Sequence, residues 1–517
     1  MIYDTQTFWS YICNESPEMI RQVKDLLNRK SFDFDTKTVK YTKFYQSINK
    51  LPGEFFEYET LRFPSGLIKF ITDKLPIQVE VKDRNIKKYT EQEVLDYAQL
   101  VHDFNPNFEI RDYQIEAVLA SLNRFSSLIY SSIGSGKTSI MSLVCKILEN
   151  DIILITNGNN FILQQIFDRL TSFGITDISW NPSKEPDYTK RIVILNTKSS
   201  DERLNRQDEN YLNFLKTVNT WITDECQHLQ ALTGFEPIFY MDNEKLQHLI
   251  GYSGSPFRNY KHPYNDLDDF VLIAILGEPA FTYEMKDTII DQNIAQPYSY
   301  FINYPGKEPW IPDNLKENYF VQYRANITYN KARNRAGIEM LKYLNKYNVK
   351  TLASINNIKP GQNLMKTLKE EGVNSIFVCG DNTIYEWVYT KRGKLKLETK
   401  TGTTDDIKKA FEDNYNIIFG STVLDEGVDI EEFQAVVLFS AGKTPIAGIQ
   451  RVGRASRKKK TGKNVSFVID FKDINGNYMF RNHYDARKKI MQDSGVINIE
   501  KVQDFCKMIE ELDIDTE

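Results

Sequence analysis

The sequence predicts an α/β protein with two parallel-sheet domains in tandem, preceded by a small mixed α/β domain. In two separate stretches, 108–260 and 325–475, short β-rich runs alternate with helical patterns, which is typical of a parallel sheet covered by helices. The chain has 517 residues, whereas a single domain usually has about 100–200. Its composition, 41% hydrophobic and 26% charged, is typical of folded domains.

Five segments are expected along the chain. They are an N-terminal accessory domain at 1–95, a first α/β domain at 96–265, a bridge at 266–324, a second α/β domain at 325–475 and a C-terminal helical extension at 476–517. In the accessory domain, Ser16 and Pro17 begin a helix that reaches Leu27, and Pro64 begins another helix.

The expected strands of the first α/β domain are Ser127–Ser131, Ile152–Thr156, Ile192–Asn196, Trp221–Thr223 and Leu249–Ser253. Those of the second are Thr351–Ile355, Ser375–Val378, Asn416–Phe419, Ala435–Phe439 and Val465–Asp470. The expected helices between the latter include Arg333–Leu344 and Asp405–Phe411. The same alternation in both domains predicts two sheets of one architecture.

Charge, cysteines and hydropathy exclude several classes of protein. A net charge of −5 argues against coating of nucleic acid by overall positive charge, so any track for a polyanion must be local. The cysteines are odd in number and form no CxxC pair, which predicts neither a disulfide framework nor a zinc site. The N-terminus lacks a signal-peptide pattern, and no run of about 18 apolar residues occurs. We expect a cytoplasmic monomer with no membrane partner.

A phosphate-binding loop is the strongest local signal. The segment Ser131–Thr138, SSIGSGKT, follows an apolar strand and opens a helical stretch, as such a loop requires. Its glycines let backbone amides approach phosphate oxygens, Lys137 reaches the β- and γ-phosphates, and the Thr138 hydroxyl is a Mg²⁺ ligand. Ser131 stands where the general pattern has its first glycine, and a Gly/Ser turn before a core helix remains the alternative.

A pair of carboxylates follows the strand predicted at Trp221–Thr223. Because the carboxyl ends of parallel strands meet at one edge of a sheet, Asp224 and Glu225 are expected beside the phosphate loop. Asp224 would hold Mg²⁺ through water, and Glu225 would orient and deprotonate an attacking water. Taken alone, an acidic pair after a strand is more often a helix cap.

Upstream of the phosphate loop, the segment Arg111–Gln114 offers an amide for a nucleobase. The Gln114 side chain can bond both the N6 and N7 edges of adenine. An ordinary surface helix explains these residues equally well.

Two segments of the second α/β domain complete a candidate site. In QRVGRASR, 450–457, a helical pattern places Arg454 and Arg457 on one face, where two guanidiniums can meet a γ-phosphate. Such arginine fingers are worth about 10³–10⁵ in rate, roughly 4–7 kcal/mol of barrier. In the segment 421–429, Gly427 permits close backbone approach and Asp429 is a candidate ribose contact. A basic surface that merges with Lys458–Lys460 is the alternative for the arginines.

Six segments in this order resemble the motif series of superfamily-2 helicases over about 110–460: Arg111–Gln114, Ser131–Thr138, Asp224–Gln227, Ser253–Ser255, Ser421–Asp429 and Gln450–Arg457. Through Ser253–Ser255, Leu276–Glu278 and Leu61–Leu67, the chain is most similar to the UvsW-type phage recombination and branch-migration helicases. The resemblance implies two RecA-like domains, an accessory domain that binds nucleic acid, and ATP with Mg²⁺ as cofactors. It also implies host cytoplasm as the location if the chain is phage-encoded.

The implied activity is that of an ATP-dependent DNA helicase or translocase. Its substrate would be branched or forked DNA, including junctions and R-loops, in replication, recombination or repair. The expected catalytic residues are Lys137, Asp224, Glu225, Gln450, Arg454 and Arg457. The expected ATP contacts are Arg111, Gln114, Ser132, Gly134, Ser135, Gly136, Lys137, Thr138, Gly427 and Asp429, with Thr138 and Asp224 as metal ligands. Gln227 replaces the His common in this family, which is expected to alter the coupling of hydrolysis to movement.

The nucleic-acid path is expected to use backbone amides and short hydroxyls on both domains. By the same resemblance, the candidates are Thr156, Thr197, Ser354 and Thr422. Residues 383–400 form an insertion whose alternation predicts a β-hairpin with a basic tip, Lys391, Arg392 and Lys394. This tip, with Trp387 and Tyr389, suggests a pin that parts a duplex, and an edge hairpin with packed aromatics is the alternative.

Two other functions remain open. One is an RNA helicase, although QRVGR at 450–454 differs from the HRIGR form of DEAD-box proteins. The other is an ATP-switched clamp that binds nucleic acid without translocating, since the motifs indicate use of ATP and not movement.

Overall fold

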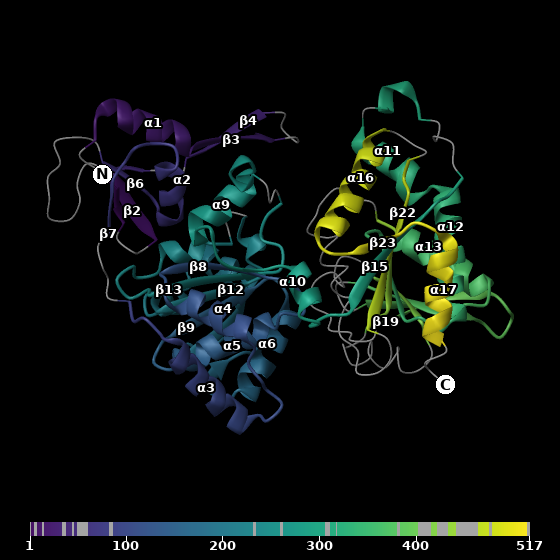
Figure 1. Cartoon of the computed structure of the whole chain (residues 1–517), viewed down its shortest axis with the longest axis horizontal. Helices are drawn as coiled ribbons and strands as arrows, with labels where there is room; N and C mark the ends of the chain where they lie inside the picture. The colour runs from purple at the N-terminus through teal and green to yellow at the C-terminus, as the bar shows by residue number, and fades with distance from the viewer. Residues whose placement is uncertain are drawn as a thin grey trace. The chain divides into compact units, whose positions relative to one another are not determined.

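The computed structural model describes residues 2–4, 8–12, 15–33, 38–43, 46–48, 60–81, 86–230, 234–258, 262–305, 311–316, 318–379, 383–401, 415–420, 433–440, 464–474 and 478–513. The chain divides into two compact units, Met1–Tyr283 and Glu284–Glu517 (Figure 1). The predicted helix Asp405–Phe411 lies outside the described residues.

The first unit is built on a parallel sheet of order β10-β11-β9-β12-β13-β8-β14. Its strands are β8 (Ser126–Ser131), β9 (Ile153–Asn157), β10 (Ile178–Ser179), β11 (Ile192–Asn196), β12 (Thr220–Asp224), β13 (His248–Ser253) and β14 (Pro279–Tyr283). Neighbouring residues face opposite sides, as in Leu128 and Ile129 or Leu154 and Ile155, and each set belongs to a different buried cluster. The five strands predicted for this domain are all present, and its parallel α/β class is confirmed.

Helices cover both faces of this sheet. One face packs against α3 (Glu91–Phe104), α4 (Asp112–Leu122), α5 (Lys137–Ile147) and α6 (Asn160–Ser172). The other packs against α7 (Thr197–Asn205), α8 (Glu209–Leu215) and α9 (Leu267–Leu276). Most residues of the central strands β8, β9, β11, β12 and β13 are buried, because helices cover both faces of the sheet there.

The accessory domain has a mixed sheet of order β5-β6-β2-β1-β7 and a separate hairpin, β3–β4. Its elements are β1 (Ile2–Asp4), β2 (Trp9–Ile12), α1 (Pro17–Leu27), β3 (Asn28–Asp33), β4 (Thr38–Lys43), β5 (Gln46–Ile48), β6 (Thr60–Pro64), a 3-10 turn Ser65–Leu67, α2 (Ile68–Thr72) and β7 (Val79–Val81). The predicted start of α1 is confirmed, since the Ser16 side chain accepts from the backbone N–H of Met19 and Pro17 opens the helix.

The accessory domain packs directly on α9. The Phe70 ring meets the Phe270 ring edge-on at 5.3 Å between centroids. A Cβ added to Gly66 would lie only 2.1 Å from the carbonyl oxygen of Ile273 and 2.8 Å from that of Ala274. The two backbones therefore approach more closely than any side chain would allow. Residues of both domains share one buried hydrophobic cluster.

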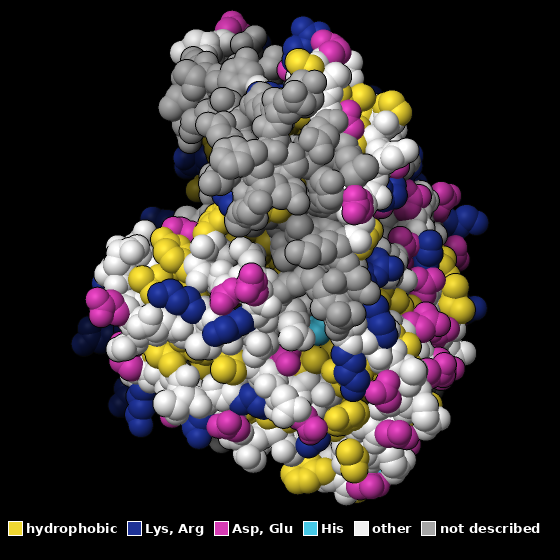
Figure 2. Space-filling view, turned by 90° about the vertical axis from the view of Figure 1, so that its left-hand side faces the viewer, with side chains coloured by type: hydrophobic (Ala, Val, Ile, Leu, Met, Phe, Trp, Pro, Cys, Tyr) yellow, Lys and Arg dark blue, Asp and Glu magenta, His cyan; other side chains and the backbone are white. Residues whose placement is uncertain are grey.

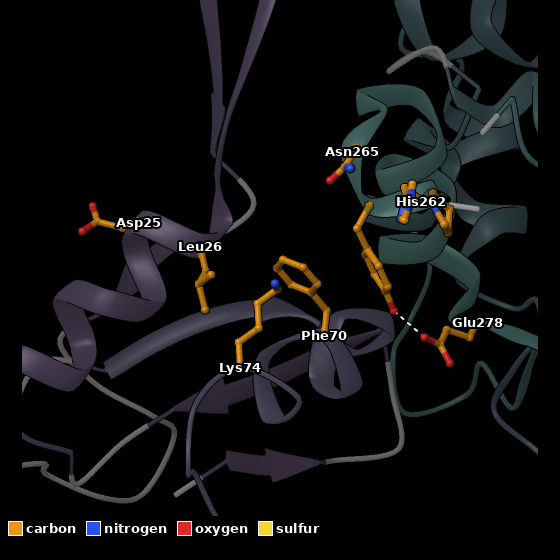
Figure 3. Close-up of a pocket in the computed structure, with 9 residues that line it drawn as sticks. Asp25, Leu26, Phe70, Lys74, His262, Asn265 and Glu278 are labelled. Atoms are coloured by element: carbon orange, nitrogen blue, oxygen red, sulfur yellow. Dashed lines mark hydrogen bonds between the residues drawn. The ribbon is translucent and has the colours of Figure 1, made fainter. Parts of the chain in front are cut away.

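A cavity of about 510 Å³ opens at this junction. Figure 3 shows Leu26, Phe70 and Lys74 of the accessory domain on one side and His262, Asn265 and Glu278 of the first α/β domain on the other. The Tyr264 hydroxyl donates to a Glu278 carboxylate oxygen at 2.6 Å. The walls carry both charge signs together with aromatic rings, so their chemistry does not select one class of ligand.

The second unit is built on a sheet of order β19-β18-β17-β20-β16-β21-β22-β15-β23. Its strands are β15 (Gln296–Ile302), β16 (Thr351–Ser354), β17 (Ser375–Val378), β18 (Thr383–Tyr389), β19 (Leu395–Thr401), β20 (Ile417–Gly420), β21 (Ala435–Leu438), β22 (Val465–Phe471) and β23 (Ile497–Ile499). Neighbours pair in parallel except in the β17–β18–β19 edge, where pairing is antiparallel. Two α/β domains in tandem are therefore confirmed.

The helices of this unit cover both faces of its sheet. One hydrophobic cluster includes α12 (Lys331–Lys346), α13 (Ile358–Glu370) and α17 (Val502–Asp513), and the other includes α10 (Met285–Ile290) and α16 (Tyr478–Asp493). A further helix, α11 (Tyr319–Tyr323), precedes α12.

The segment boundaries in the structure differ from the predicted ones. Residues predicted as a bridge contribute β14 to the first sheet and β15 to the second. Residues predicted as a helical extension contribute β23 to the second sheet, and α16 and α17 cover it. β14 has only five residues, most of them half-buried, so periodicity alone did not assign it to a sheet.

A buried ion cluster ties α12, β22 and α16 together. Its members are Arg333, Asp470, Asp473 and Arg487, each at most 7% exposed. Arg487 donates to Asp470 at 2.6 Å and to Asp473 at 3.0 Å, while Arg333 donates to Asp473 at 2.9 Å. The two positive and two negative charges compensate each other away from water, which a single buried charge cannot do.

Disulfides and membrane-spanning helices can be assessed only in the described residues. There, Cys145, Cys226, Cys379 and Cys506 are free thiols. Among the helices that the structure describes, none is long and apolar enough to cross a membrane.

Candidate active site

The phosphate loop joins β8 to α5, as predicted. Gly134 and Gly136 adopt φ of +84° and +79°, a region that glycine enters without steric cost. The Lys137 ammonium donates to the carbonyl oxygen of Ser131 at 3.1 Å, across the loop. Ser131, the departure from the general pattern, is buried, and its hydroxyl donates to the Ser135 hydroxyl at 2.6 Å. The serine therefore braces the loop that a glycine would leave unsupported.

Gln114 lies directly against this loop. Its amide nitrogen donates to the carbonyl oxygen of Ser135 at 2.8 Å, and its oxygen accepts from the backbone N–H of Arg111 at 3.1 Å. The Tyr113 hydroxyl donates to the same Ser135 carbonyl at 2.9 Å. One amide hydrogen and one lone pair of Gln114 remain beyond these two bonds, enough for one face of a base. The alternative of an ordinary surface helix fails for Gln114, which is 6% exposed.

Asp224 and Glu225 follow β12 at the same edge of the sheet. Asp224 is 7% exposed, and its Oδ1 atom has no hydrogen-bond partner among the described residues. Burial, and after it the charge of Glu225, raises the pKa of the Asp224 carboxyl to about 7, although the Lys137 ammonium acts in the opposite sense. A buried carboxylate oxygen without a partner is a suitable ligand for a cation.

Asp224 and Thr138 offer oxygen donors of the kind that Mg²⁺ binds. The described part of the chain contains no cluster of three His, Cys, Asp or Glu side chains that could hold a metal. Mg²⁺ is commonly bound through one or two protein oxygens, with water and substrate phosphates completing the octahedron. Asp224 and the half-buried Thr138 at the start of α5 offer that donor set.

A chain of hydrogen bonds connects Glu225 to the next strand. The Gln227 amide nitrogen donates to Glu225 Oε2 at 2.8 Å, and the Ser253 hydroxyl donates to Gln227 Oε1 at 2.6 Å. The backbone N–H of Ser255 donates to the Ser253 hydroxyl oxygen at 3.0 Å. Glu225 itself has φ of +51°, an uncommon conformation for a residue with a side chain. Gln227, which replaces a family His, thus links the carboxylate to the Ser253–Ser255 loop.

This loop also reaches the phosphate loop. A Cβ added to Gly254 would lie 3.3 Å from the Lys137 ammonium nitrogen. The structure therefore brings together four segments that are far apart in sequence, at the residues Gln114, Lys137, Asp224 and Gly254. Sheet order explains the meeting, because β8, β13 and β12 are neighbours and their carboxyl ends share one edge.

Several predicted site residues lie outside the described residues: Thr422, Gly427, Asp429, Gln450, Arg454 and Arg457. Ser132 is described and buried at the base of the phosphate loop, where its backbone N–H donates to the Tyr283 carbonyl at 2.9 Å. Arg111 is exposed, and its guanidinium donates to the Tyr113 hydroxyl at 2.9 Å.

The candidate nucleic-acid contacts differ in accessibility. Thr156 is 2% exposed, and its hydroxyl oxygen accepts from the Trp221 indole N–H at 3.0 Å. Ser354 is also 2% exposed. Thr197 is half-buried at the first turn of α7. Of these three, Thr197 is the side chain placed where a strand could reach it.

The 383–400 insertion is an antiparallel hairpin at the edge of the second sheet, with Gly393 at φ +72° in its turn. The Trp387 indole N–H donates to the Gln362 carbonyl of α13 at 2.9 Å, so that ring packs on the domain as in the edge-hairpin alternative. Tyr389 is 54% exposed, and the basic tip residues Lys391, Arg392 and Lys394 are all exposed. A role of the tip in nucleic-acid binding stays a prediction.

Sequence reasoning missed an aromatic pair beside the site. Tyr113 and Tyr283 stack with ring centroids 3.9 Å apart and planes 7° apart. Tyr113 lies next to Gln114 in sequence, but Tyr283 comes from β14, which was predicted to be part of the bridge. The pairing of β14 with β8 was the missing information.

Charge is mixed over the side of the first unit seen in Figure 2. Lysines and arginines alternate there with aspartates and glutamates, and the described side chains of that face form no broad area of one sign. This agrees with a net charge of −5. Binding of a polyanion would depend on local groups rather than on the overall field.

Two family models match the chain. Residues 107–258 match "Type III restriction enzyme, res subunit", and residues 362–459 match "Helicase conserved C-terminal domain". The first match spans the phosphate loop, the acidic pair and the Ser253–Ser255 loop. The second covers most of the second sheet.

Curated relatives are similar over most of the chain. A protein named "Putative helicase 22", from the Sulfolobus islandicus filamentous virus, is 23% identical over 87% of this chain and 76% of its own length. A "DNA 3'-5' translocase XPB2" from Sulfurisphaera tokodaii is 22% identical over 73% of this chain and 87% of its own.

A solved structure shares the fold. The structure of S. cerevisiae Dbp5 bound to RNA and ADP BeF3 covers 81% of this chain and 97% of its own at 14% identity, with a TM-score of 0.52. The crystal structure of T4 UvsW covers 97% of this chain and 99% of its own at 15% identity, with a TM-score of 0.40.

Proposed function

The chain is an ATP-dependent helicase of superfamily 2, and from this premise we propose that hydrolysis at the β8–β12–β13 edge drives remodelling of branched DNA. The observation that carries the hydrolysis half of this proposal is the hydrogen-bonded chain from Glu225 through Gln227 to Ser253, next to Lys137 and Asp224. It fixes a candidate general base and ends at the loop whose Gly254 lies beside the Lys137 ammonium.

The phosphate loop binds the nucleotide. Backbone amides at the N-terminus of α5 and the Lys137 ammonium neutralise the β- and γ-phosphates, and Gln114 holds the base. To bind, ATP must replace the bond from Lys137 to the Ser131 carbonyl. Mg²⁺, held by Thr138 and Asp224, would screen the charge that develops between the phosphates.

Glu225 orients and deprotonates the attacking water. Its position after β12 places it beside Asp224, and the Gln227 amide fixes one carboxylate oxygen. This bond restricts rotation of the Glu225 side chain, so its second carboxylate oxygen keeps a fixed direction toward the attacking water. Ser253 transmits the state of the neighbouring loop to this carboxylate through Gln227.

The second unit contributes the remaining catalytic groups. We assign transition-state charge stabilisation to Gln450, Arg454 and Arg457, and nucleotide contacts to Gly427 and Asp429, on the order of the motifs in the sequence. Arginine fingers of this kind contribute about 10³–10⁵ in rate. Hydrolysis that needs residues of both units responds to their movement, as a motor requires.

The proposed substrate is branched DNA, and the proposed role is in recombination, repair or replication. They rest on the UvsW-type segments, Leu61–Leu67 among them, and on a relative named as a DNA translocase. The accessory domain is fixed to α9 at Gly66 and Phe70, so a duplex bound there would be held by the same body that binds ATP.

Strand displacement from a synthetic fork tests the proposal. Wild type should release the strand only with ATP and Mg²⁺, and Lys137→Ala should abolish release. Lys146→Ala removes a positive charge from the last turn of the same helix and should leave release intact. A Holliday junction, an R-loop and an RNA duplex in parallel reactions show the preferred substrate. Displacement that survives Lys137→Ala would contradict the proposal, and preference for RNA duplex would favour an RNA helicase.

A further inference from the structure

A second cavity, of about 260 Å³, lies at the β10 edge of the first sheet. Its walls are the first turns of α6 and α7 and the loop that follows β10. The side chains that matter below are Asn160, Trp180, Asn181, Lys184 and Lys198. None of them belongs to the candidate ATP site.

Hydrogen bonds fix the walls of this cavity. The Trp180 indole N–H donates to the Gln164 side-chain oxygen of α6 at 2.9 Å, which fixes the plane of the ring. Arg203, 6% exposed, donates to the Ser199 hydroxyl at 3.2 Å and to the Tyr188 hydroxyl at 3.0 Å. The cavity is therefore formed before any ligand arrives, which reduces the entropic cost of binding.

The lining combines three chemistries, and one exposed carboxylate, Glu202, also lies in it. The half-buried indole of Trp180 offers an aromatic face, and the exposed amides of Asn160 and Asn181 offer donors and acceptors. Lys184 and Lys198 are exposed and positively charged. Stacking, amide hydrogen bonds and a flanking positive charge are together what an unpaired nucleobase with its phosphates requires. A free phosphate would explain the lysines but neither the indole nor the amides.

The size of the cavity sets a further limit. About 260 Å³ is below the roughly 300–1,000 Å³ of sites for drug-sized ligands. It suits one flat ring system and excludes a paired duplex. The bound strand must therefore be single at this point.

The position of the cavity agrees with this ligand. Asn196 donates to the Gly158 carbonyl at 3.0 Å and to the Asn160 side-chain oxygen at 2.8 Å, so it joins the ends of β9 and β11. The next residue is Thr197, the accessible candidate for a strand phosphate. Asn196 and Lys198, the neighbours of Thr197 in sequence, line the cavity, so a strand that touches Thr197 comes close to it.

We propose that this cavity receives one unpaired base of the bound DNA strand, stacked on Trp180, while Lys184 and Lys198 hold the adjacent phosphates. The inference rests on the proposed function, because it concerns the strand that the helicase engages. It goes beyond phosphate contacts by assigning a base subsite that is sequence-tolerant, since every base has a stacking face.

Paired binding measurements on the full chain test the subsite. The probes are fluorescent oligothymidylate and an abasic strand of equal length, which keeps the phosphates and lacks bases. Wild type should bind oligothymidylate more tightly. Trp180→Ala should weaken oligothymidylate binding by about 5- to 150-fold and leave abasic binding unchanged, while Trp180→Phe should retain most of the preference. Unchanged abasic binding also shows that the Trp180→Ala chain is folded.

Three results would overturn the inference. They are equal binding of both strands by wild type, a base preference that survives Trp180→Ala, and an equal loss for both strands in that variant, which would assign Trp180 a structural role. Failure of the proposed function is a separate observation, namely wild type that displaces no strand from a fork with ATP.

Discussion

The bond from Ser253 to Gln227 offers the sharpest test of how the site works. Ser253→Ala removes a hydroxyl that donates to Gln227 Oε1 at 2.6 Å and accepts from Ser255 at 3.0 Å. Ser253 is fully buried and Gln227 is 5% exposed, so water does not readily replace the lost donor. A buried acceptor left without a partner costs about 1–3 kcal/mol.

That free energy converts directly into a rate. If it acts wholly on the orientation of Glu225, kcat for DNA-stimulated ATP hydrolysis should fall about 5- to 150-fold. KM for ATP should stay near the wild-type value, because the phosphate loop and its Lys137–Ser131 bond are untouched. Steady-state ATPase kinetics over a range of ATP concentrations separate the two parameters.

A double-substitution cycle tests whether the chain of bonds acts as one unit. Gln227→Leu breaks both of its bonds, so Ser253→Ala should cost little more in that background. Ser121→Ala is the matched control, since Ser121 is also fully buried and bonds the Ala117 carbonyl and the Tyr252 hydroxyl elsewhere in the unit. Multiplicative losses in kcat, or a change confined to KM, would refute the reasoning.

Three further predictions concern packing and charge. Gly66→Ala should destabilise the chain by about 1–3 kcal/mol, because the added Cβ would meet backbone atoms of α9. Gly158→Ala is the control, since a Cβ there has no atom within 4 Å and should leave the thermal midpoint unchanged. Equal midpoints for the two variants would contradict the docking of the accessory domain on α9. Arg487→Met should leave two buried aspartates with too little compensating charge and lower the Tm by about 6–20 °C. Arg481→Met, on the exposed side of α16, is the control and should leave the Tm unchanged. An unchanged Tm for Arg487→Met would mean that the ion cluster does not stabilise the chain. Alanine at all three residues of the basic tip should weaken DNA binding and reduce its dependence on salt, as measured by titration at several salt concentrations. Binding curves identical to those of wild type would mean that the tip does not contact DNA.

The sequence was sufficient wherever a pattern is local. The phosphate loop could be placed because SSIGSGKT sits between an apolar run and a helical run, and Ser16 and Pro17 located the start of α1 for the same kind of reason. Asp224 and Glu225 were expected beside that loop because carboxyl ends of parallel strands share an edge.

The sequence was insufficient for contacts that depend on the order of the strands in a sheet. The Gln227–Ser253 bond exists because β12 and β13 are neighbours, and the Tyr113–Tyr283 stack exists because β14 pairs with β8. Neither adjacency can be inferred from periodicity. Thr156 was a candidate nucleic-acid contact by resemblance, but its hydroxyl oxygen accepts from the Trp221 indole N–H of the neighbouring strand. Such cross-strand contacts depend on three-dimensional pairing.

Triplex displacement tests the central claim, that ATP hydrolysis moves this chain along DNA. A third strand bound to a duplex is released only when a motor passes beneath it. Wild type should displace it with ATP and Mg²⁺, and Glu225→Gln should bind ATP and DNA yet displace nothing. If wild type binds DNA in an ATP-dependent way but leaves the triplex intact, the chain is a clamp and the claim is wrong.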